Sequence, residues 1–292
     1  MTFGIRGNIL RPELAKVTMD LIKSLDIKKI KYLVDNELAR FIKKQAGKSI
    51  KSDKIAKPAQ LVKKSDFIVS IGGDGTFLAT AKLVNSNGVP IIGVNLGKLG
   101  YLAETPVNKI SQFISDIIKQ KFRIEERTAL EASSNVNGHT IHAMNEIVIN
   151  QSGIIKTVFI QVFYNDSLVI SYHADGLIVA TPTGSTGYSL SAGGPIATPD
   201  TNVVILCPIC PHTFSARPVI LPDDGIILVK IEYKVPINVI ADGNDSFVLK
   251  KDASIEIKKA PYKIKTVIPV NSNYFKILNR KLLWGEDKRI LK

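Results

Sequence analysis

Cysteine is scarce in this sequence, which argues against a disulfide or zinc scaffold. The 292 residues contain two cysteines, Cys207 and Cys210, in the run Cys-Pro-Ile-Cys. One such pair is short of the ligands that a structural zinc ion needs. The neighbouring prolines favour an extended strand end over the strand-to-helix turn of a thioredoxin-like redox motif. We therefore expect two reduced thiols, which fits a reducing cytosol.

Long apolar runs are also missing. No segment approaches the roughly 20 apolar residues of a membrane span. The N-terminus has no long apolar stretch behind a basic head, as a secretory signal would have. We therefore expect a cytoplasmic protein that has no membrane partner.

Acidic residues are too few to balance the basic ones, and the formal net charge is +13. Such an excess suits anionic partners, among them nucleotides, polyphosphate and nucleic acid. Much of it lies between Lys28 and Lys64, where few aromatic side chains are present to stack on bases. We interpret this stretch as a solvated lysine-rich face and expect no nucleic-acid partner.

The first part of the chain alternates between strand and helix patterns. This alternation predicts an α/β domain, residues 1–125, with a parallel sheet and helices on both faces. The expected strands are 3–6, 30–34, 67–71 and 89–94, and the expected helices are 12–25, 38–42, 77–84 and 110–118.

The pattern changes after about Phe122 to short segments rich in Val, Ile, Thr and Phe. This pattern predicts an all-β domain, residues 126–270, in which a short helix begins near Ser185. We expect the tail, 271–292, to return to the first domain, and the lysine-rich 45–57 to be a mobile loop. The expected strands are 140–149, 157–164, 168–172, 177–181, 226–232 and 237–240.

A glycine-rich turn, Gly72-Gly73-Asp74-Gly75-Thr76, follows the apolar strand 67–71 directly. Backbone N–H groups in such a turn, and the N-terminus of the following helix, suit nucleotide phosphates. The charge of Asp74 would repel phosphate, so its presence needs a role: it holds Mg²⁺, or it accepts a proton from an attacking hydroxyl. The alternative is a plain tight turn in which Asp74 caps the helix.

Two further motifs carry polar groups beside apolar strands. The run from Asp175 to Pro195 is dense in hydroxyls and glycines, which offer neutral donors to ribose and phosphate oxygens; the alternative is a set of ordinary turns. Asn145 and Glu146 lie inside the expected strand 144–149, where neighbouring side chains face opposite sides. If Glu146 is the buried one, its carboxylate needs a partner. The alternative is that one of the two side chains faces water.

These motifs together resemble the NAD kinase family, in the family's order, from about residue 66 to 245. The first motif is shared with diacylglycerol, sphingosine and phosphofructo-kinases, and the later ones are more specific. The matching runs are Gly72 to Thr76, Asn95 to Leu102, Asn145 to Val148, Asp175 to Pro195 and Pro211 to Pro218.

The resemblance implies a kinase that transfers the terminal phosphoryl group of ATP, or of polyphosphate, to the 2′-hydroxyl of the adenosine ribose of NAD, making NADP. It implies a divalent metal, usually Mg²⁺, accompanying ATP, with no metal ligand assigned in the protein, and a homodimer or homotetramer. Asp74 resembles the catalytic base, and Gly72, Gly73, Gly75 and Thr76 resemble the donor-phosphate loop. The residues that resemble dinucleotide contacts are Tyr101, Asn145, Glu146, His173, Asp175, Thr183, Thr186, Gly187, Tyr188, Ser191 and Asn244.

Some positions depart from the commonest family pattern. His173 stands where many members have Arg or Lys, Gly187 replaces a frequent Ala, and Asn244 ends a segment that often ends in Gln. Two other functions remain open at this point: a lipid kinase of the same superfamily, and a non-catalytic NAD(P) sensor.

Overall fold

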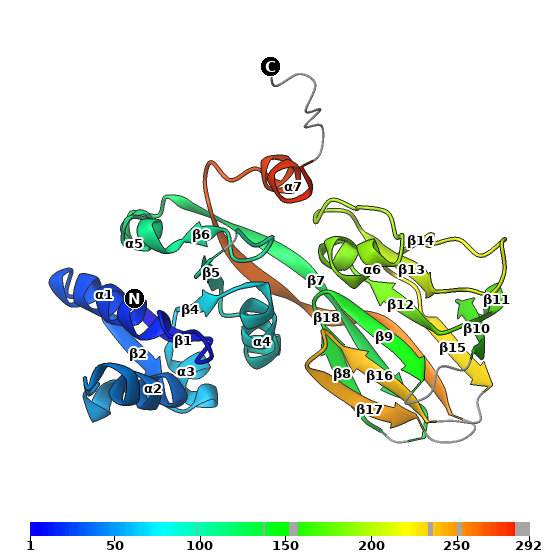
Figure 1. Ribbon diagram of the computed structural model, residues 1–292, viewed down its shortest axis with the longest axis horizontal. Coiled ribbons are helices and arrows are strands. Elements are labelled where there is room, and N and C mark those ends of the chain that lie inside the picture. The colour runs from blue at the N-terminus through cyan, green and yellow to red at the C-terminus, as the bar shows by residue number, and fades with distance from the viewer. Residues whose placement is uncertain (98, 137, 152–156, 233–235, 250–252, 284–292) are drawn as a thin grey trace, which may run out of the picture. The chain divides into compact units, whose positions relative to one another are not determined.

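The chain divides into two compact units (Figure 1). The structure is a computed structural model, and it describes residues 1–97, 99–136, 138–151, 157–232, 236–249 and 253–283. The first unit comprises Met1–Glu126 and the chain from Ile264 onward, and the second comprises Arg127–Lys263. Strand β18, Ser254–Pro269, begins in the second unit and ends in the first, so the chain returns before residue 271. Residues 284–292 of the expected tail lie outside the described residues.

The first unit contains a parallel sheet in the order β18-β5-β4-β1-β2-β3. Phe3 and Ile5 of β1 belong to a core shared with helices α1, α2 and α5. Gly4 faces the opposite side, where an added Cβ would meet Leu61 of α3 at 3.1 Å. Helices therefore cover both faces, as predicted. The strands are β1 (Thr2–Gly7), β2 (Lys31–Asp35), β3 (Ile55–Ala56), β4 (Phe67–Gly72), β5 (Ile91–Asn95) and β6 (Thr105–Pro106).

Local sequence signals explain where several helices begin and end. The Asp35 side chain accepts the N–H of Glu37 and caps α2, which ends at a left-handed Gly47. The expected loop 45–57 is wrong in part, because it contains a short 3₁₀ helix and β3. The helices are α1 (Leu14–Ile27), α2 (Asn36–Ala46), η1 (Ser52–Lys54), α3 (Pro58–Lys64), α4 (Asp74–Val84), η2 (Asn85–Asn87), η3 (Val107–Lys109), α5 (Ile110–Ile118) and α7 (Tyr274–Leu282).

The second unit contains two sets of antiparallel strands that share one apolar core. One sheet has the order β14-β13-β12-β9-β16-β17, and the other runs β11-β10-β15-β18, with β7 and β8 beside β18. The all-β prediction is therefore confirmed, apart from its short helices. The elements are β7 (Phe122–Ser134), β8 (Thr140–Ala143), β9 (Glu146–Gln151), β10 (Val158–Tyr164), β11 (Ser167–Ala174), β12 (Gly176–Ala180), η4 (Thr183–Thr186), α6 (Tyr188–Ser191), β13 (Val203–Ile209), β14 (Val219–Pro222), β15 (Ile227–Glu232), β16 (Ile237–Ala241) and β17 (Asp245–Leu249).

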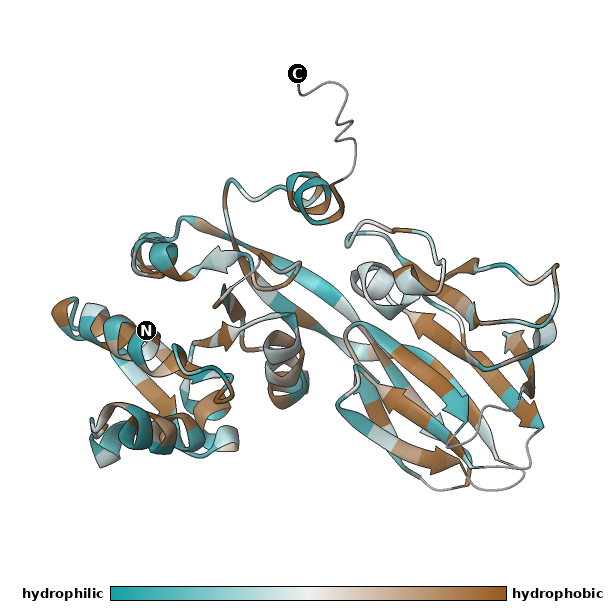
Figure 2. Cartoon of the chain, in the orientation of Figure 1, coloured by the Kyte–Doolittle hydropathy of each residue, from teal (hydrophilic) through white to brown (hydrophobic). Residues whose placement is uncertain are grey.

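Strand β12 is buried along its whole length. It is made mostly of apolar residues and is therefore coloured mainly brown in Figure 2. It pairs with β9 on one side and with β13 on the other. Such a strand fixes the positions of the polar turns at its two ends, because its own register cannot slip without exposing apolar side chains.

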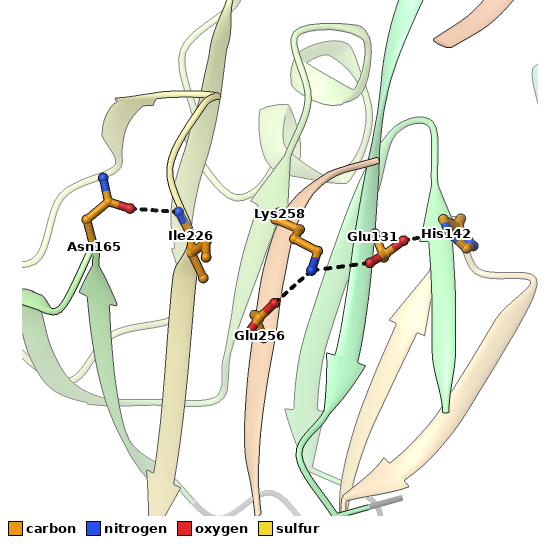
Figure 3. A network of polar contacts seen from close by, with 6 residues as sticks. All are labelled: Glu131, His142, Asn165, Ile226, Glu256 and Lys258. Carbon is orange, nitrogen blue, oxygen red and sulfur yellow. Dashed lines mark hydrogen bonds and ion pairs between the residues drawn. The ribbon is translucent and has the colours of Figure 1, made fainter. Parts of the chain in front are cut away.

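Polar side chains on β7, β8 and β18 form a separate network (Figure 3). Glu131 lies 3.2 Å from the ring nitrogen Nε2 of His142 and 3.6 Å from Nζ of Lys258, which also pairs with Glu256 at 3.0 Å. The proximity of Glu256 and Glu131 raises the pKa of Lys258. These pairs are partly exposed, so we interpret them as a polar surface of the sheet.

Both cysteines are free, with Cys207 buried and Cys210 exposed, as expected. Cys207 lies in β13, and Cys210 follows the end of that strand. Among the described residues, no helix combines the length and the apolar character needed to cross a membrane.

Candidate active site

The glycine-rich turn follows β4 and starts α4, as the sequence predicts. The Gly73 N–H donates to Oγ1 of Thr76 at 3.4 Å. Gly72 is required for packing, because an added Cβ would lie 2.6 Å from Cβ of Thr76. At Gly73 and Gly75 an added Cβ would meet nothing within 4 Å. Packing therefore does not demand glycine at these two positions, and their backbone is open to an incoming group.

The Asp74 carboxylate is held by three consecutive backbone amides. The N–H of Tyr101 donates to Oδ2 at 2.9 Å, and the N–H groups of Leu102 and Ala103 donate to Oδ1 at 3.0 Å each. A carboxylate offers about four lone-pair positions, so Oδ1 is filled by the protein and Oδ2 keeps one position open. Asp74 does more than begin a helix, because residues 101–103 (the 101–103 loop) fix the direction of its side chain.

Buried contacts hold the 101–103 loop in place. The side chain Nδ2 of Asn95, at the end of β5, donates to the carbonyl of Ala103 at 3.1 Å. An added Cβ at Gly93 would lie 2.7 Å from Cα of Ala103, so this glycine permits the close approach. The chain thus builds the loop against β5, which pairs with β4, the strand that leads into the Asp74 turn.

Tyr101 connects the 101–103 loop to helix α7. Nζ of Lys281 lies 5.0 Å from the centre of its ring, a cation–π distance. The hydroxyl of Tyr101 is buried and has no hydrogen-bond partner among the described residues. Burial, with smaller effects of Tyr274 and Asp74, raises the pKa of Tyr101, so its hydroxyl stays protonated and able to donate.

In the second unit, one carboxylate organises the Asn145–Glu146 pair. Asp242, in the turn after β16, accepts the N–H groups of Met144, Asn145 and Glu146 at 2.7, 2.8 and 3.1 Å. The expected strand 140–149 is wrong here: β8 ends at Ala143 and β9 begins at Glu146. The chain breaks the strand because Asp242 takes the amides that a continuous ladder would use. Asn145 therefore lies in a turn rather than within a strand.

Glu146 is a buried carboxylate whose atom Oε2 has no hydrogen-bond partner among the described residues. Burial, followed by the nearby charge of Asp242, raises the pKa of Glu146 to about 7, against a smaller opposing effect of the Tyr188 backbone N–H. Oδ1 of Asn145 is likewise buried and without a partner. Two unused acceptors side by side are suited to a ligand that brings donors, such as ribose hydroxyls or an amino group.

The hydroxyl-rich run packs its glycines directly against this pair. An added Cβ at Gly184 would lie 2.8 Å from Cα of Asn145, and one at Gly187 would lie 2.8 Å from Oε2 of Glu146. Thr183 is buried beside them, and Thr186 Oγ1 donates to its carbonyl at 3.3 Å. The run is therefore built onto the Asn145–Glu146 turn.

Several hydroxyls of the run serve the fold, as the ordinary-turn alternative expected. Oγ of Ser185 donates to the Pro182 carbonyl at 2.6 Å, and Oγ1 of Thr181 donates to the Met144 carbonyl at 2.6 Å. Tyr188 and Ser191, by contrast, lie exposed on α6. Tyr188 keeps 45% of its surface accessible, so its ring is available to stack on a base.

Not all of the candidate residues of the second unit come together. Gly176 pairs with Asn150 and Ala180 pairs with Glu146, so Asp175 and Glu146 lie at opposite ends of the β9–β12 pair. The exposed His173 lies near Asp175 at the far end of this pair. At 3.3 Å per residue, the length of β12 puts that end about 16 Å from Glu146. Oδ1 of Asp175 is buried without a partner among the described residues. Within one chain, this pair forms a separate group.

Asn244 lies beside Asp242 in the turn after β16. Its Nδ2 donates to the Asp242 carbonyl at 2.9 Å, and its N–H donates to Ala241 at 2.9 Å. Asp242 itself was missed as a site residue, and so were Asn95 and Thr181, because each acts on backbone groups, which carry no side-chain signal in the sequence. The Asp242-Gly243 pair is a local sequence signal of a tight turn, and both residues have a left-handed φ in the structure, +49° and +65°.

A parallel α/β unit with a carboxylate in its glycine turn, followed by an all-β unit, defines a small-molecule kinase class. The models of the ATP-NAD kinase N-terminal and C-terminal domains match residues 3–122 and 144–269. The chain belongs to the NAD kinase family.

Curated relatives and solved structures agree with this assignment. The NAD kinase of Flavobacterium psychrophilum is 33% identical, covering 99% of this chain and all of the relative, and that of Flavobacterium johnsoniae is 39% identical over 77% and 78%. The crystal structure of yeast NADH kinase complexed with NADH has a TM-score of 0.89 at 26% identity, covering 98% of this chain and 89% of that one. An NAD kinase from Archaeoglobus fulgidus in complex with ATP has a TM-score of 0.76 at 25% identity, covering 97% and 99%.

Proposed function

We propose that this chain transfers the terminal phosphoryl group of ATP to the 2′-hydroxyl of the adenosine ribose of NAD, making NADP. Family membership, and the likeness to enzymes solved with NADH and with ATP, support this activity. The observation that carries the mechanism is the Asp74 carboxylate, fixed by three amides with one lone-pair position of Oδ2 left open. Inorganic polyphosphate is the alternative donor.

Asp74 acts as the catalytic base in this proposal. The ribose 2′-oxygen attacks the terminal phosphorus of ATP, and the bond from that phosphorus to the β-phosphate oxygen breaks, releasing ADP. The hydroxyl proton passes to Oδ2 of Asp74. Because Oδ1 already accepts two N–H groups, Oδ2 is the oxygen that receives the proton. The open backbone at Gly75 provides an N–H donor for the phosphates, in the loop formed with Gly72, Gly73 and Thr76.

The second unit holds NAD. Asn145 and Glu146 contribute their buried free acceptors, and Gly187 packs against them. Thr183 and Thr186 come from the same run, Tyr188 and Ser191 offer exposed side chains on α6, and Asn244 lies near the turn that fixes the pair. Tyr101, in the first unit, has a buried hydroxyl that is free to donate. His173 and Asp175 lie apart from this group, which supports a contact to the dinucleotide of another subunit in a homodimer or homotetramer.

A divalent metal, with Mg²⁺ as the usual ion, accompanies ATP in this proposal. No group of three His, Cys, Asp or Glu side chains suited to a metal was found within the described part of the chain. In nucleotide sites Mg²⁺ is usually held by phosphate oxygens of the substrate and by water, and we propose the same here. When bound, the metal offsets the charge of the phosphates. We place the reaction in the cytoplasm, where NAD and ATP meet.

An end-point assay tests the activity: protein, ATP, Mg²⁺ and NAD, with the product detected by an NADP-specific dehydrogenase. We expect NADP to form. Parallel incubations with polyphosphate and with diacylglycerol separate the donor alternative from a lipid kinase. Labelled lipid without NADP, or NAD binding without ATP consumption, would contradict the proposal.

Asp74→Asn tests the base. A general base contributes about 10²–10⁴ in rate, so we expect kcat to fall by that factor while NAD still binds in a calorimetric titration. Asp20→Asn, on the exposed face of α1, is the matched control and should turn over like the wild type. If the two variants have equal kcat values, Asp74 is not the base.

A further inference from the structure

A cavity of about 330 Å³ lies within the first unit, beside α5 and α7. Its apolar lining includes Pro106, Phe113, Pro269 and Ile277. Phe113 and Ile277 also have their side chains in the interior, so this part of the cavity is firmly held. Polar and charged side chains complete the lining.

Positive charge at this cavity exceeds the negative charge of its walls, because three cationic side chains and two carboxylates line it. Lys109, Lys276 and Arg280 line it, and none of the three has an ion-pair partner among the residues that the structure describes. The two carboxylates of the lining already accept hydrogen bonds: Glu104 from Oγ of Ser272, and Asp116 from Nε2 of Gln112 at 2.9 Å. Three unpaired cations beside an apolar floor form a site for an anion that has an apolar body.

We propose that this cavity binds a small organic anion, an aryl phosphate or an aryl carboxylate. The ring would cover the apolar floor, and the anionic group would pair with Lys276 and Arg280, which lie four residues apart on the same face of α7. Lys109, from η3, offers a third cation at the same cavity. Arg suits such a group especially well, because its planar guanidinium binds phosphate and carboxylate in a bidentate manner.

The same cavity is connected to Asp74 by the chain itself. Leu99 and Glu104 line the cavity and lie on either side of the 101–103 loop, whose amides hold the Asp74 carboxylate. Helix α7 contacts this segment through Lys281 on the ring of Tyr101, and Ser272 before the helix donates to Glu104. An anion that draws Lys276 and Arg280 inward would therefore act on the loop that fixes the base. This coupling rests on the proposed function, whereas the binding site does not.

Calorimetric titration of the full chain with phenyl phosphate tests the site, with phenol and inorganic phosphate as controls for ring and charge. We expect phenyl phosphate to bind more tightly than either control. Lys276→Gln with Arg280→Gln should weaken this binding at least tenfold. The matched control, Lys43→Gln with Lys44→Gln, removes the same charge from the last turn of α2 and should bind like the wild type. Equal binding by the two double variants, or none by the wild type, would overturn the site.

The rate of NADP formation tests the coupling. The ratio of initial rates with and without phenyl phosphate, at saturating NAD and ATP, should differ from one by at least twofold in the wild type. It should return to one in the Lys276→Gln, Arg280→Gln variant. A ratio of one in a wild type that binds phenyl phosphate would overturn the coupling. A chain that makes no NADP at all contradicts the proposed function instead, and the titration still decides the site.

Discussion

Gly100 lies so close to the Asp74 carboxylate that there is no room for a side chain at position 100. An added Cβ at Gly100 would overlap Oδ1 of the carboxylate and would lie 2.8 Å from Cγ. The Gly100 N–H donates to the carbonyl of Ala103 at 3.3 Å, which closes the turn that presents the three amides. The absence of a side chain at Gly100 leaves room for the carboxylate, and the three amides of the turn orient it.

Gly100→Ala should displace the Asp74 carboxylate without removing it. A misplacement of about 1 Å can cost about 10²-fold in rate, so we expect kcat to fall by roughly that factor while the NAD dissociation constant changes little. Gly97→Ala is the matched control, because an added Cβ there would meet nothing within 4 Å. Steady-state kinetics of both variants decide the matter: equal kcat values would show that the contact does not position the base.

The sequence predicts the alternating unit well because its signals are local. The apolar strand before Gly72 and the helical spacing after Phe77 are visible within a few residues, and β4 and α4 lie where they predict. The 101–103 loop could not be predicted in the same way. Its contact with Asp74 joins residues 27 to 29 positions apart, and backbone amides carry no side-chain signature.

The second unit shows the same limit at Asn145. An apolar run from Met144 to Ile149 predicts a continuous strand, because the side-chain pattern alone cannot show which amides are already used. Asp242 takes three of them from nearly 100 residues away, and the strand starts at Glu146 instead. Long-range bonds to backbone groups override the local propensity here.

Asp242→Asn should loosen the Asn145–Glu146 turn. The variant keeps the shape of the side chain but removes the charge that strengthens its three hydrogen bonds, each worth about 1.5–3 kcal/mol when one partner is charged. Removal of a buried charge offsets part of this loss, so we expect unfolding in urea to become easier by about 1–3 kcal/mol. Affinity for NAD should fall with it.

Asp166→Asn is the matched control for that variant. Asp166 is exposed in the same unit and has a similar left-handed φ, +66° against +49° at Asp242. Replacement there changes the charge and the backbone preference in the same way without touching the turn. A free energy of unfolding that falls equally in both variants would assign the effect to general charge rather than to the three amides.

Gly187→Ala should disturb the binding of NAD rather than the chemical step. The added methyl would lie 2.8 Å from Oε2 of Glu146, so the carboxylate must move away from its present place. We expect KM for NAD to rise about threefold to tenfold, on the order of 1 kcal/mol, with kcat largely kept.

Glu146→Asp provides the test of that reasoning, because the shorter side chain withdraws the carboxylate from Gly187. If the crowding is real, the double variant Gly187→Ala, Glu146→Asp should show a smaller rise in KM than the two single effects combined. Such non-additivity is expected only for residues in contact. Strictly additive effects would mean that the methyl group and the carboxylate do not meet.

Glu146 should make the stability of the protein depend on pH in an unusual direction. Its carboxyl group loses its proton near pH 4.5 when unfolded and near pH 7 when folded, because burial and the charge of Asp242 raise its pKa. Between these values the unfolded state binds fewer protons, so the free energy of unfolding falls as pH rises. Above pH 7 this decrease in the free energy of unfolding is complete, and it is on the order of 3 kcal/mol.

Glu146→Gln removes this titration and keeps the size of the side chain. Relative to the wild type, the variant should gain stability progressively between about pH 5 and pH 8, as measured by urea unfolding across that range. Burial raises the pKa of Asp242 as well, and because Asp242 is buried in both proteins, this part of its titration is common to the two curves. Glu232→Gln, on the exposed end of β15, should run parallel to the wild type at every pH. A Glu146→Gln curve that also runs parallel would show that the Glu146 carboxylate is as well stabilised in the folded chain as in water.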